Sequence, residues 1–259
     1  MNLKQKMFIQ FMIKNGAATT DQALSFCQDS VENFVELKLF IHEINREISK
    51  QNFKIGLTTC EVSNQDFVLW LNTKNDDVSK LQITYSTIEL EYFHVLMQEI
   101  LISEHRRITY ATALNITSSL TSNFTRTNGQ TVLKKWFAGQ YFIKENSYVY
   151  LGSRLITEFT TYLKIQSPDQ ICKLCSELVF KGRICASCDS INHSYCLDKY
   201  LERQNNCPSC SEEWTEKDDG SLYTQNTVVT QESAESNDED GDEEQGRPVR
   251  KNRSASQRK

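Results

Sequence analysis

Residues 172–210 read CKLCSELVFKGRICASCDSINHSYCLDKYLERQNNCPSC. This stretch contains three CxxC pairs and one HxxC pair, which together supply seven cysteines and one histidine. A tight turn within each pair directs two metal-binding side chains toward one point, and four such pairs are enough for two tetrahedral sites. The spacing therefore predicts a small module that binds two Zn²⁺ ions through Cys172, Cys175, Cys185, Cys188, His193, Cys196, Cys207 and Cys210.

A disulfide framework is the competing interpretation of the same cysteines. Of the nine cysteines in the chain, only Cys27 and Cys60 lie outside the module, and both occur in apolar patterns typical of buried thiols. The chain begins MNLKQKMFIQFMIKNG, an amphipathic pattern without the apolar segment of a secretory signal. These features favour a reducing compartment, where such cysteine spacing indicates metal binding. The module is also too short to fold on an apolar core alone.

The ligand spacing leaves two questions open. It allows two consecutive four-ligand sites, and it equally allows two interleaved sites. It also does not decide whether the metal only holds the module together or supports an activity. A structural module and an active one share the same ligands, so the residues around the ligands have to distinguish them.

The composition of the whole chain is that of a soluble globular protein with two or three small domains. Its 259 residues are 39% hydrophobic and 24% charged, and the formal net charge is −5. No run of about 18 apolar residues occurs, so we expect no membrane span. The slightly negative charge gives no general reason to expect nucleic-acid binding.

Residues 1–72 follow the element order of a winged helix, which is three helices and then a hairpin. Apolar residues recur at helical spacing from Leu3 to Met12, with Gly16 as the expected stop, and again over about 20–28 and over 31–50. From Phe53 the apolar period changes to two, and a polar turn at 63–66 precedes the return strand. We therefore assign residues 1–72 to a winged-helix domain A.

The same order recurs after a polar linker at residues 73–80. Ser86 and Glu89 form a capping-box pattern in front of an apolar helix. The elements expected next are a strand at 108–110, helices near 111–119 and 128–138, a hairpin over 141–151 and a helix over 153–165. We assign residues 81–166 to a winged-helix domain B and residues 169–214 to the zinc module.

The C-terminal residues 216–259 have the composition of a disordered tail, because few apolar side chains remain to offset the entropy of ordering. Residues 232–244 carry eight acidic side chains, and residues 247–259 carry six basic ones. The basic block is typical of a nuclear-import or nucleic-acid-binding tail. It is equally consistent with a solvated tail whose two charge blocks attract each other.

The ligand order is four cysteines, one histidine and three cysteines, whereas the usual RING finger has histidine as its fourth ligand. PHD fingers share this order but carry a tryptophan two residues before the seventh ligand, where this chain has Asn205. The last ligand pair, Cys207-Pro208-Ser209-Cys210, is RING-like. Together with WFAGQYFIKENSYVYLGSRLITEF at 136–159, the module resembles the non-SMC element 1 family, the RING-like subunit of the five/six-type SMC complex in DNA repair. The resemblance covers roughly residues 1–215.

The resemblance implies an α+β fold class with two tandem winged-helix domains, a small two-zinc RING-like domain and a disordered tail. It also implies interleaved sites, with the first zinc held by Cys172, Cys175, His193 and Cys196 and the second by Cys185, Cys188, Cys207 and Cys210. The implied activity is that of a RING-type E3 ubiquitin ligase. Such ligases favour the reactive orientation of a ubiquitin-charged conjugating enzyme (E2) and hold no covalent intermediate.

An E2-docking surface is therefore expected rather than a nucleophile. By resemblance to RING fingers, Leu174 and Pro208 would lie on that surface, and Leu201 would flank it together with Leu197 and Tyr200. Ordinary packing around zinc is an equally good reason for Leu201 to be apolar. Many active RING fingers have a basic residue directly after the last ligand, whereas this chain has Ser211. Weak or partner-dependent activity is the expected consequence.

Two other functions compete with the ligase. The first is a structural assembly subunit that binds a MAGE-type partner and the kleisin of the complex, with the zinc module as a docking platform. The second is DNA binding by the helix at 128–138, which carries Lys134 and Lys135 and follows Arg126. Three cations make a weak phosphate-binding stripe, so DNA contact is expected to be indirect, through the complex. The resemblance implies a nuclear, chromatin-associated protein.

Overall fold

The computed structural model describes residues 1–74 and 85–217. Residues 75–80 of the expected linker, residues 81–84 of the expected domain B and residues 218–259 of the expected tail lie outside the described residues. No helix in the described ranges is long and apolar enough to span a membrane.

The first winged helix is built from residues 3–72. Its elements are α1 (Leu3–Asn15), β1 (Ala17–Thr19), α2 (Thr20–Cys27), α3 (Phe34–Ile48), the 3-10 turn η1 (Ser49–Gln51), β2 (Phe53–Thr59) and β3 (Asp66–Asn72). The strands form an antiparallel sheet in the order β1-β3-β2. β1 is not among the elements predicted from the sequence, because three residues are too few to show an alternating pattern.

Side-chain caps fix the ends of these helices. Asn2 accepts a hydrogen bond from the N–H of Gln5, and Thr19 does the same for Gln22, so α1 and α2 both begin in capping boxes. Gly16 ends α1 at a φ of 72°, a conformation that favours glycine. The apolar faces of the helices then meet in one core. This core includes Phe8, Met12, Leu37, Ile41, Ile44, Ile55 and Val68.

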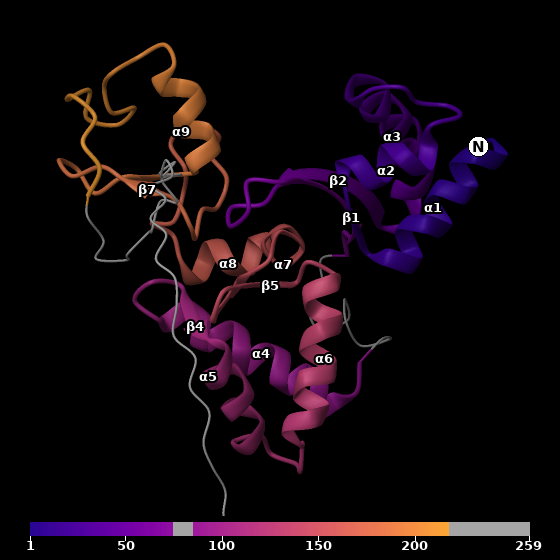
Figure 1. The fold of residues 1–259 in the computed structure, drawn as a ribbon, viewed down its shortest axis with the longest axis horizontal. Helices are drawn as coiled ribbons and strands as arrows, with labels where there is room; N and C mark the ends of the chain where they lie inside the picture. The colour runs from indigo at the N-terminus through magenta and orange to yellow at the C-terminus, as the bar shows by residue number, and fades with distance from the viewer. Residues whose placement is uncertain (75–84, 218–259) are drawn as a thin grey trace, which may run out of the picture. The chain divides into compact units, whose positions relative to one another are not determined.

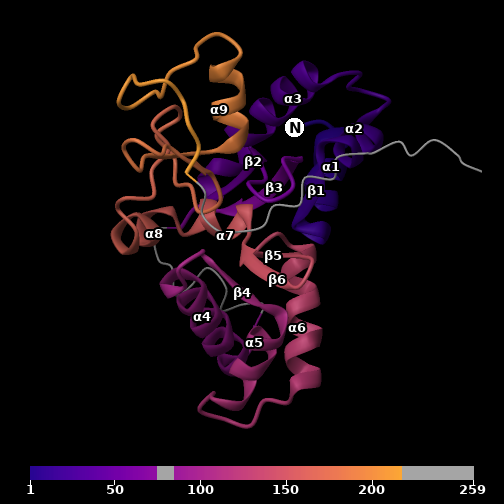
Figure 2. The ribbon, with the colours of Figure 1, turned by 60° about the vertical axis from the view of Figure 1, so that its left-hand side comes forward.

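The second winged helix repeats the order with residues 87–151. Its elements are α4 (Thr87–Ile102), β4 (Arg107–Thr109), α5 (Tyr110–Asn115), the 3-10 turn η2 (Ile116–Ser118), α6 (Arg126–Ala138), β5 (Phe142–Glu145) and β6 (Tyr148–Leu151). Its sheet order, β4-β6-β5, matches that of the first domain. α4, α5 and α6 form one group of helices, and the hairpin of β5 and β6 lies at one end of α6 (Figures 1 and 2). The core centres on the buried Trp136 and Phe93, whose rings meet edge to face.

The helix expected over 153–165 is two helices, α7 (Ser153–Glu158) and α8 (Thr160–Gln166). Between them the backbone of Phe159 leaves helical values, at φ −104° and ψ 19°. The hydroxyls of Thr157 and Thr160 donate to the carbonyls of Ser153 and Ile156, 2.7 and 2.8 Å away. Threonine bonding to the preceding helical turn bends helices, which accounts for the break.

The C-terminal module has little regular structure. It consists of β7 (Arg183–Ile184), β8 (Ile191–Asn192) and α9 (Ser194–Leu201), joined by loops. Its backbone pairing continues past the expected end at residue 214, because Glu216 forms a bridge with Cys185 and the N–H of Lys217 donates to Ile184. Residues 216–217 therefore belong with the module rather than with the tail. The predicted order of two winged helices followed by a small, loop-rich module is confirmed.

Candidate metal centre

The three CxxC motifs adopt the same backbone turn. In each, the N–H four residues after the first cysteine donates to that cysteine's carbonyl, from Ser176 to Cys172, from Asp189 to Cys185 and from Ser211 to Cys207. The three donor residues have left-handed φ values of 62°, 55° and 63°. Because the turn closes tightly behind the second cysteine, both thiols face the same point. The local sequence thus prepares three ligand pairs independently of the rest of the fold.

The ligand pairs combine in an interleaved arrangement. Cluster one contains Cys172, Cys175, His193 and Cys196, and cluster two contains Cys185, Cys188, Cys207 and Cys210. Within each cluster all ligand atoms lie within 4.8 Å of one another. Spacing alone allowed consecutive sites as well, so the three-dimensional structure decides this question. All eight ligand residues predicted from the sequence are brought together.

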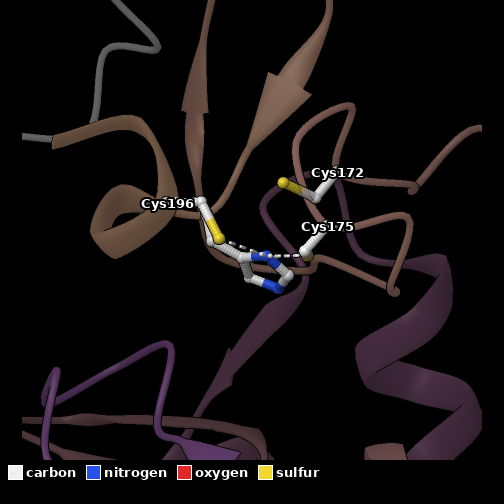
Figure 3. Close-up of side chains that lie close together, drawn as sticks. Cys172, Cys175 and Cys196 are labelled. Atoms are coloured by element: carbon white, nitrogen blue, oxygen red, sulfur yellow. Dashed lines mark hydrogen bonds between the residues drawn. The ribbon is translucent and has the colours of Figure 1, made fainter. Parts of the chain in front are cut away.

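The distances within the clusters fit a tetrahedral metal ion. Bonds of about 2.3 Å from zinc to sulfur place neighbouring sulfurs about 3.8 Å apart. In cluster two the Sγ atoms of Cys188 and Cys207 are 3.7 Å apart, and those of Cys185 and Cys210 are 4.0 Å apart. In cluster one the Nδ1 atom of His193 lies 3.3 Å from Cys175 Sγ and 3.9 Å from Cys196 Sγ (Figure 3). The donor atoms and their separations therefore suit two metal ions.

The ring of His193 is oriented by acceptors on its far side. Its Nε2 atom lies 2.9 Å from the carbonyl oxygen of Leu178 and 3.2 Å from Glu61 Oε1. An imidazole nitrogen between two acceptors has to carry the proton, so Nδ1 is the nitrogen left to bind a metal. Glu61 was not among the residues predicted from the sequence. It lies 132 positions from His193, in a polar turn that carries no metal-binding signature.

Two thiols of cluster one, Cys172 and Cys196, have pKa values shifted in opposite directions in the metal-free chain. Burial raises the pKa of Cys172, but hydrogen bonds with His193 and with the backbone of Cys175 and Leu174 outweigh it and hold the pKa at about 6. Burial and the neighbouring Cys175 and Cys172 raise the pKa of Cys196 to about 12. A bound divalent ion favours the ionised form of both thiols because it attracts every thiolate at once.

The residues expected to form an E2-docking surface are accessible in part. Leu174, Pro208 and Leu201 are all half-buried. Leu197, which was expected to flank that surface, is fully buried and packs inside the module instead. Ser211 is exposed at its turn. On α6, Lys134 and Lys135 are exposed, and Arg126 is held to Asn115 by a 3.1 Å hydrogen bond.

Fold and site together define a class of protein, two winged helices followed by a RING-like module with two interleaved cysteine and histidine clusters. A family model described as RING-like domain matches residues 172–210. A second, described as Nse1 non-SMC component of SMC5-6 complex, matches residues 5–159. The chain therefore belongs to the Nse1 family, as its sequence resemblance predicted.

Curated relatives carry the name non-structural maintenance of chromosomes element 1 homolog. The protein from Drosophila melanogaster is 28% identical over 69% of this chain and 78% of its own length. The Xenopus laevis protein is 24% identical over 83% of both chains, and the human protein is 25% identical over 69% of both. A chain of a solved Nse1-Nse3-Nse4 complex shares the fold with a TM-score of 0.69 at 23% identity, covering 84% of this chain and 98% of that chain.

Proposed function

We propose that both clusters bind Zn²⁺ and that the chain is a RING-type E3 ubiquitin ligase subunit of the SMC5-6 complex, acting in DNA repair and recombination. The interleaved clusters in a RING-like module are the observation that carries this proposal. Zinc suits ligand sets rich in thiolate, and in closed four-ligand sites it is structural. Its role here is to hold the loops of the module in place. The ligase activity itself resides in a protein surface.

That surface is assigned to the half-buried Leu174, Pro208 and Leu201. Leu174 lies inside the first ligand turn and Pro208 inside the last, so zinc binding fixes the backbone on both sides of each residue. An E2 docked there would have its ubiquitin thioester positioned for attack by a lysine of the substrate. The absence of a basic side chain at Ser211 makes the activity weak or partner-dependent.

The alternative function is a non-catalytic assembly subunit. The solved relative is a chain of a complex with Nse3 and Nse4, and we propose a MAGE-type partner and a kleisin partner for this chain. The exposed apolar side chains of the first winged helix support such an assembly role. They include Leu3, Met7 and Ile13 on α1, Phe26 on α2, and Val35 and Leu39 on α3, all between 42% and 72% exposed. A nuclear, chromatin-associated location and indirect DNA contact complete this proposal.

A ubiquitination assay separates the two functions. The full chain, with zinc counted on the same sample, is incubated with a panel of E2 enzymes, alone and with the MAGE-type partner. If the protein is a ligase, we expect two zinc ions per protein molecule and the formation of ubiquitin chains only in the presence of the partner. We also expect that Leu174→Ala abolishes those chains while the zinc content stays at two. Two zinc ions without ubiquitin chains under any condition would favour the assembly subunit.

A further inference from the structure

Glu61 is a buried carboxylate in the turn between β2 and β3 of the first winged helix. Its side chain is 8% exposed. Burial of a carboxylate is unfavourable unless donors satisfy its oxygens, so the identity of those donors shows what holds the group in place. The core of the winged helix does not require a buried glutamate in the turn between β2 and β3.

The donors that Glu61 meets belong to the RING-like module. Its Oε2 atom accepts hydrogen bonds from the backbone N–H groups of Phe180 and Lys181, at 2.9 and 2.8 Å. Its Oε1 atom faces Nε2 of His193 at 3.2 Å. One oxygen thus holds the backbone of the module, and the other faces a ligand of cluster one. The two oxygens have separable roles.

We infer that Glu61 is a positioning residue for the metal in cluster one: it orients the imidazole of His193 and thereby couples metal binding to the attachment of the first winged helix. The inference rests on the proposed occupancy of the cluster by zinc. A carboxylate that accepts the far N–H of a metal-binding histidine fixes the tautomer and makes the ring a better ligand. Leu178 supplies a second acceptor, but its carbonyl is neutral and comes from the module itself.

Such coupling acts in both directions. If the contact with Glu61 strengthens metal binding, metal binding strengthens the contact by the same free energy. The effect is confined to cluster one, because the described contacts of Glu61 include no residue of cluster two. Loss of metal from cluster one would therefore loosen the first winged helix as well as the module.

Substitution with glutamine separates the two roles of Glu61. In Glu61→Gln the side-chain oxygen can still accept from Phe180 and Lys181, while the amide group, a donor, is turned toward the N–H of His193. Glu61→Ala removes both contacts. Glu145→Gln is the matched control, since Glu145 also pairs with Lys181, at 2.9 Å, and belongs to the other winged helix.

The experiment measures the release of zinc from the full-length chain to a chromogenic chelator, 4-(2-pyridylazo)resorcinol. In Glu61→Gln and Glu61→Ala, one of the two zinc ions is expected to leave about tenfold faster, with the other unchanged. In Glu145→Gln both ions should leave at the wild-type rate. Cobalt substitution identifies the affected site, because three sulfurs and one nitrogen give a different visible spectrum from four sulfurs.

A purely structural role for Glu61 predicts a different result. In that case Glu61→Gln, which keeps the backbone hydrogen bonds, releases both ions at the wild-type rate. That outcome, or equal acceleration of both ions, overturns the inference while leaving the proposed function intact. A wild-type chain that binds no zinc would instead overturn the proposed function and the inference with it. Thermal unfolding of each variant, followed by circular dichroism, shows whether accelerated release precedes general unfolding.

Discussion

The two clusters have the same burial pattern but different surroundings. Each has two buried ligands, one exposed ligand and one half-buried ligand. Around cluster one, Asn192 accepts from the N–H of Lys173, and His193 faces Glu61 of the first winged helix. Around cluster two, the polar neighbours of the sulfurs are Ser190 and the N–H of Ser209, both within the module. One cluster is therefore connected to the rest of the protein, whereas the described contacts of the other are local.

Removal of a ligand from each cluster is expected to have the largest effect. Cys172→Ser and Cys207→Ser should each reduce the zinc content from two ions to one, with the loss of roughly 10 kcal/mol of metal-linked folding energy. Only Cys172→Ser should also release the first winged helix. Hydrogen exchange at residues 60–66 tests this difference, since those amides should lose protection in the first variant and keep it in the second. Equal loss of protection in both would refute the distinction between the clusters.

Truncation of the buried Leu197 on α9 should weaken both clusters together. Leu197 is fully buried on α9, which follows His193 of cluster one and leads toward Cys207 of cluster two. Leu197→Ala is expected to cost about 2–5 kcal/mol of unfolding free energy. Urea unfolding and zinc release measure the effect, and Lys199→Ala on the exposed side of α9 is the control. Faster release from one cluster alone would show that α9 supports the two unequally.

Acid should release zinc from both clusters, and mild alkali should raise the zinc affinity of cluster one. Burial raises the pKa of Cys172 and of Cys207, but hydrogen bonds outweigh it and lower both to about 6 in the metal-free chain. Protons therefore begin to compete with metal for these two thiols as the pH falls through that value. Burial lowers the pKa of His193, but the neighbouring Cys172 and Glu61 raise it by more than burial lowers it. The resulting pKa is about 10, above the usual 6.5. A rise from pH 7 toward 10 removes this competing proton, so cluster one should gain affinity. Competition with a chelator at several pH values, read by cobalt spectra, measures both trends.

The same pKa shifts make the unfolding free energy of the metal-free chain depend on pH. His193 has a folded pKa above its usual 6.5, so its contribution is complete below pH 6.5 and is lost as the pH rises through about 10. Cys172 has a folded pKa below its usual 9.0, so its contribution is complete above pH 9 and is lost as the pH falls through about 6. Unfolding of the chelator-treated chain should therefore show greatest stability between these limits.

Local sequence patterns predicted most of this architecture. The ligand pairs are visible because each is a turn of four residues, and the capping box of α4 is visible in Ser86 and Glu89. What escaped prediction depends on contacts distant in sequence. β1 exists only because Ala17, Ala18 and Thr19 pair with β3. No local pattern distinguishes Glu61 from any other glutamate in a polar turn, because its partners lie between 119 and 132 residues away.

The smallest expected effect concerns the missing basic residue. Ser176 and Ser211 occupy equivalent positions in the first and last ligand turns, both exposed and with φ values of 62° and 63°. Ser211→Arg should raise ubiquitin-chain formation about two- to fivefold, as expected for one exposed charge contact of about 0.5–1 kcal/mol. Ser176→Arg places arginine at the same left-handed backbone conformation in the turn of cluster one. It should leave the rate of ubiquitin-chain formation unchanged. Both variants should retain two zinc ions. If the two variants form ubiquitin chains at equal rates, the position after the last ligand does not face the E2. The docking surface assigned to Leu174 and Pro208 would then be wrong.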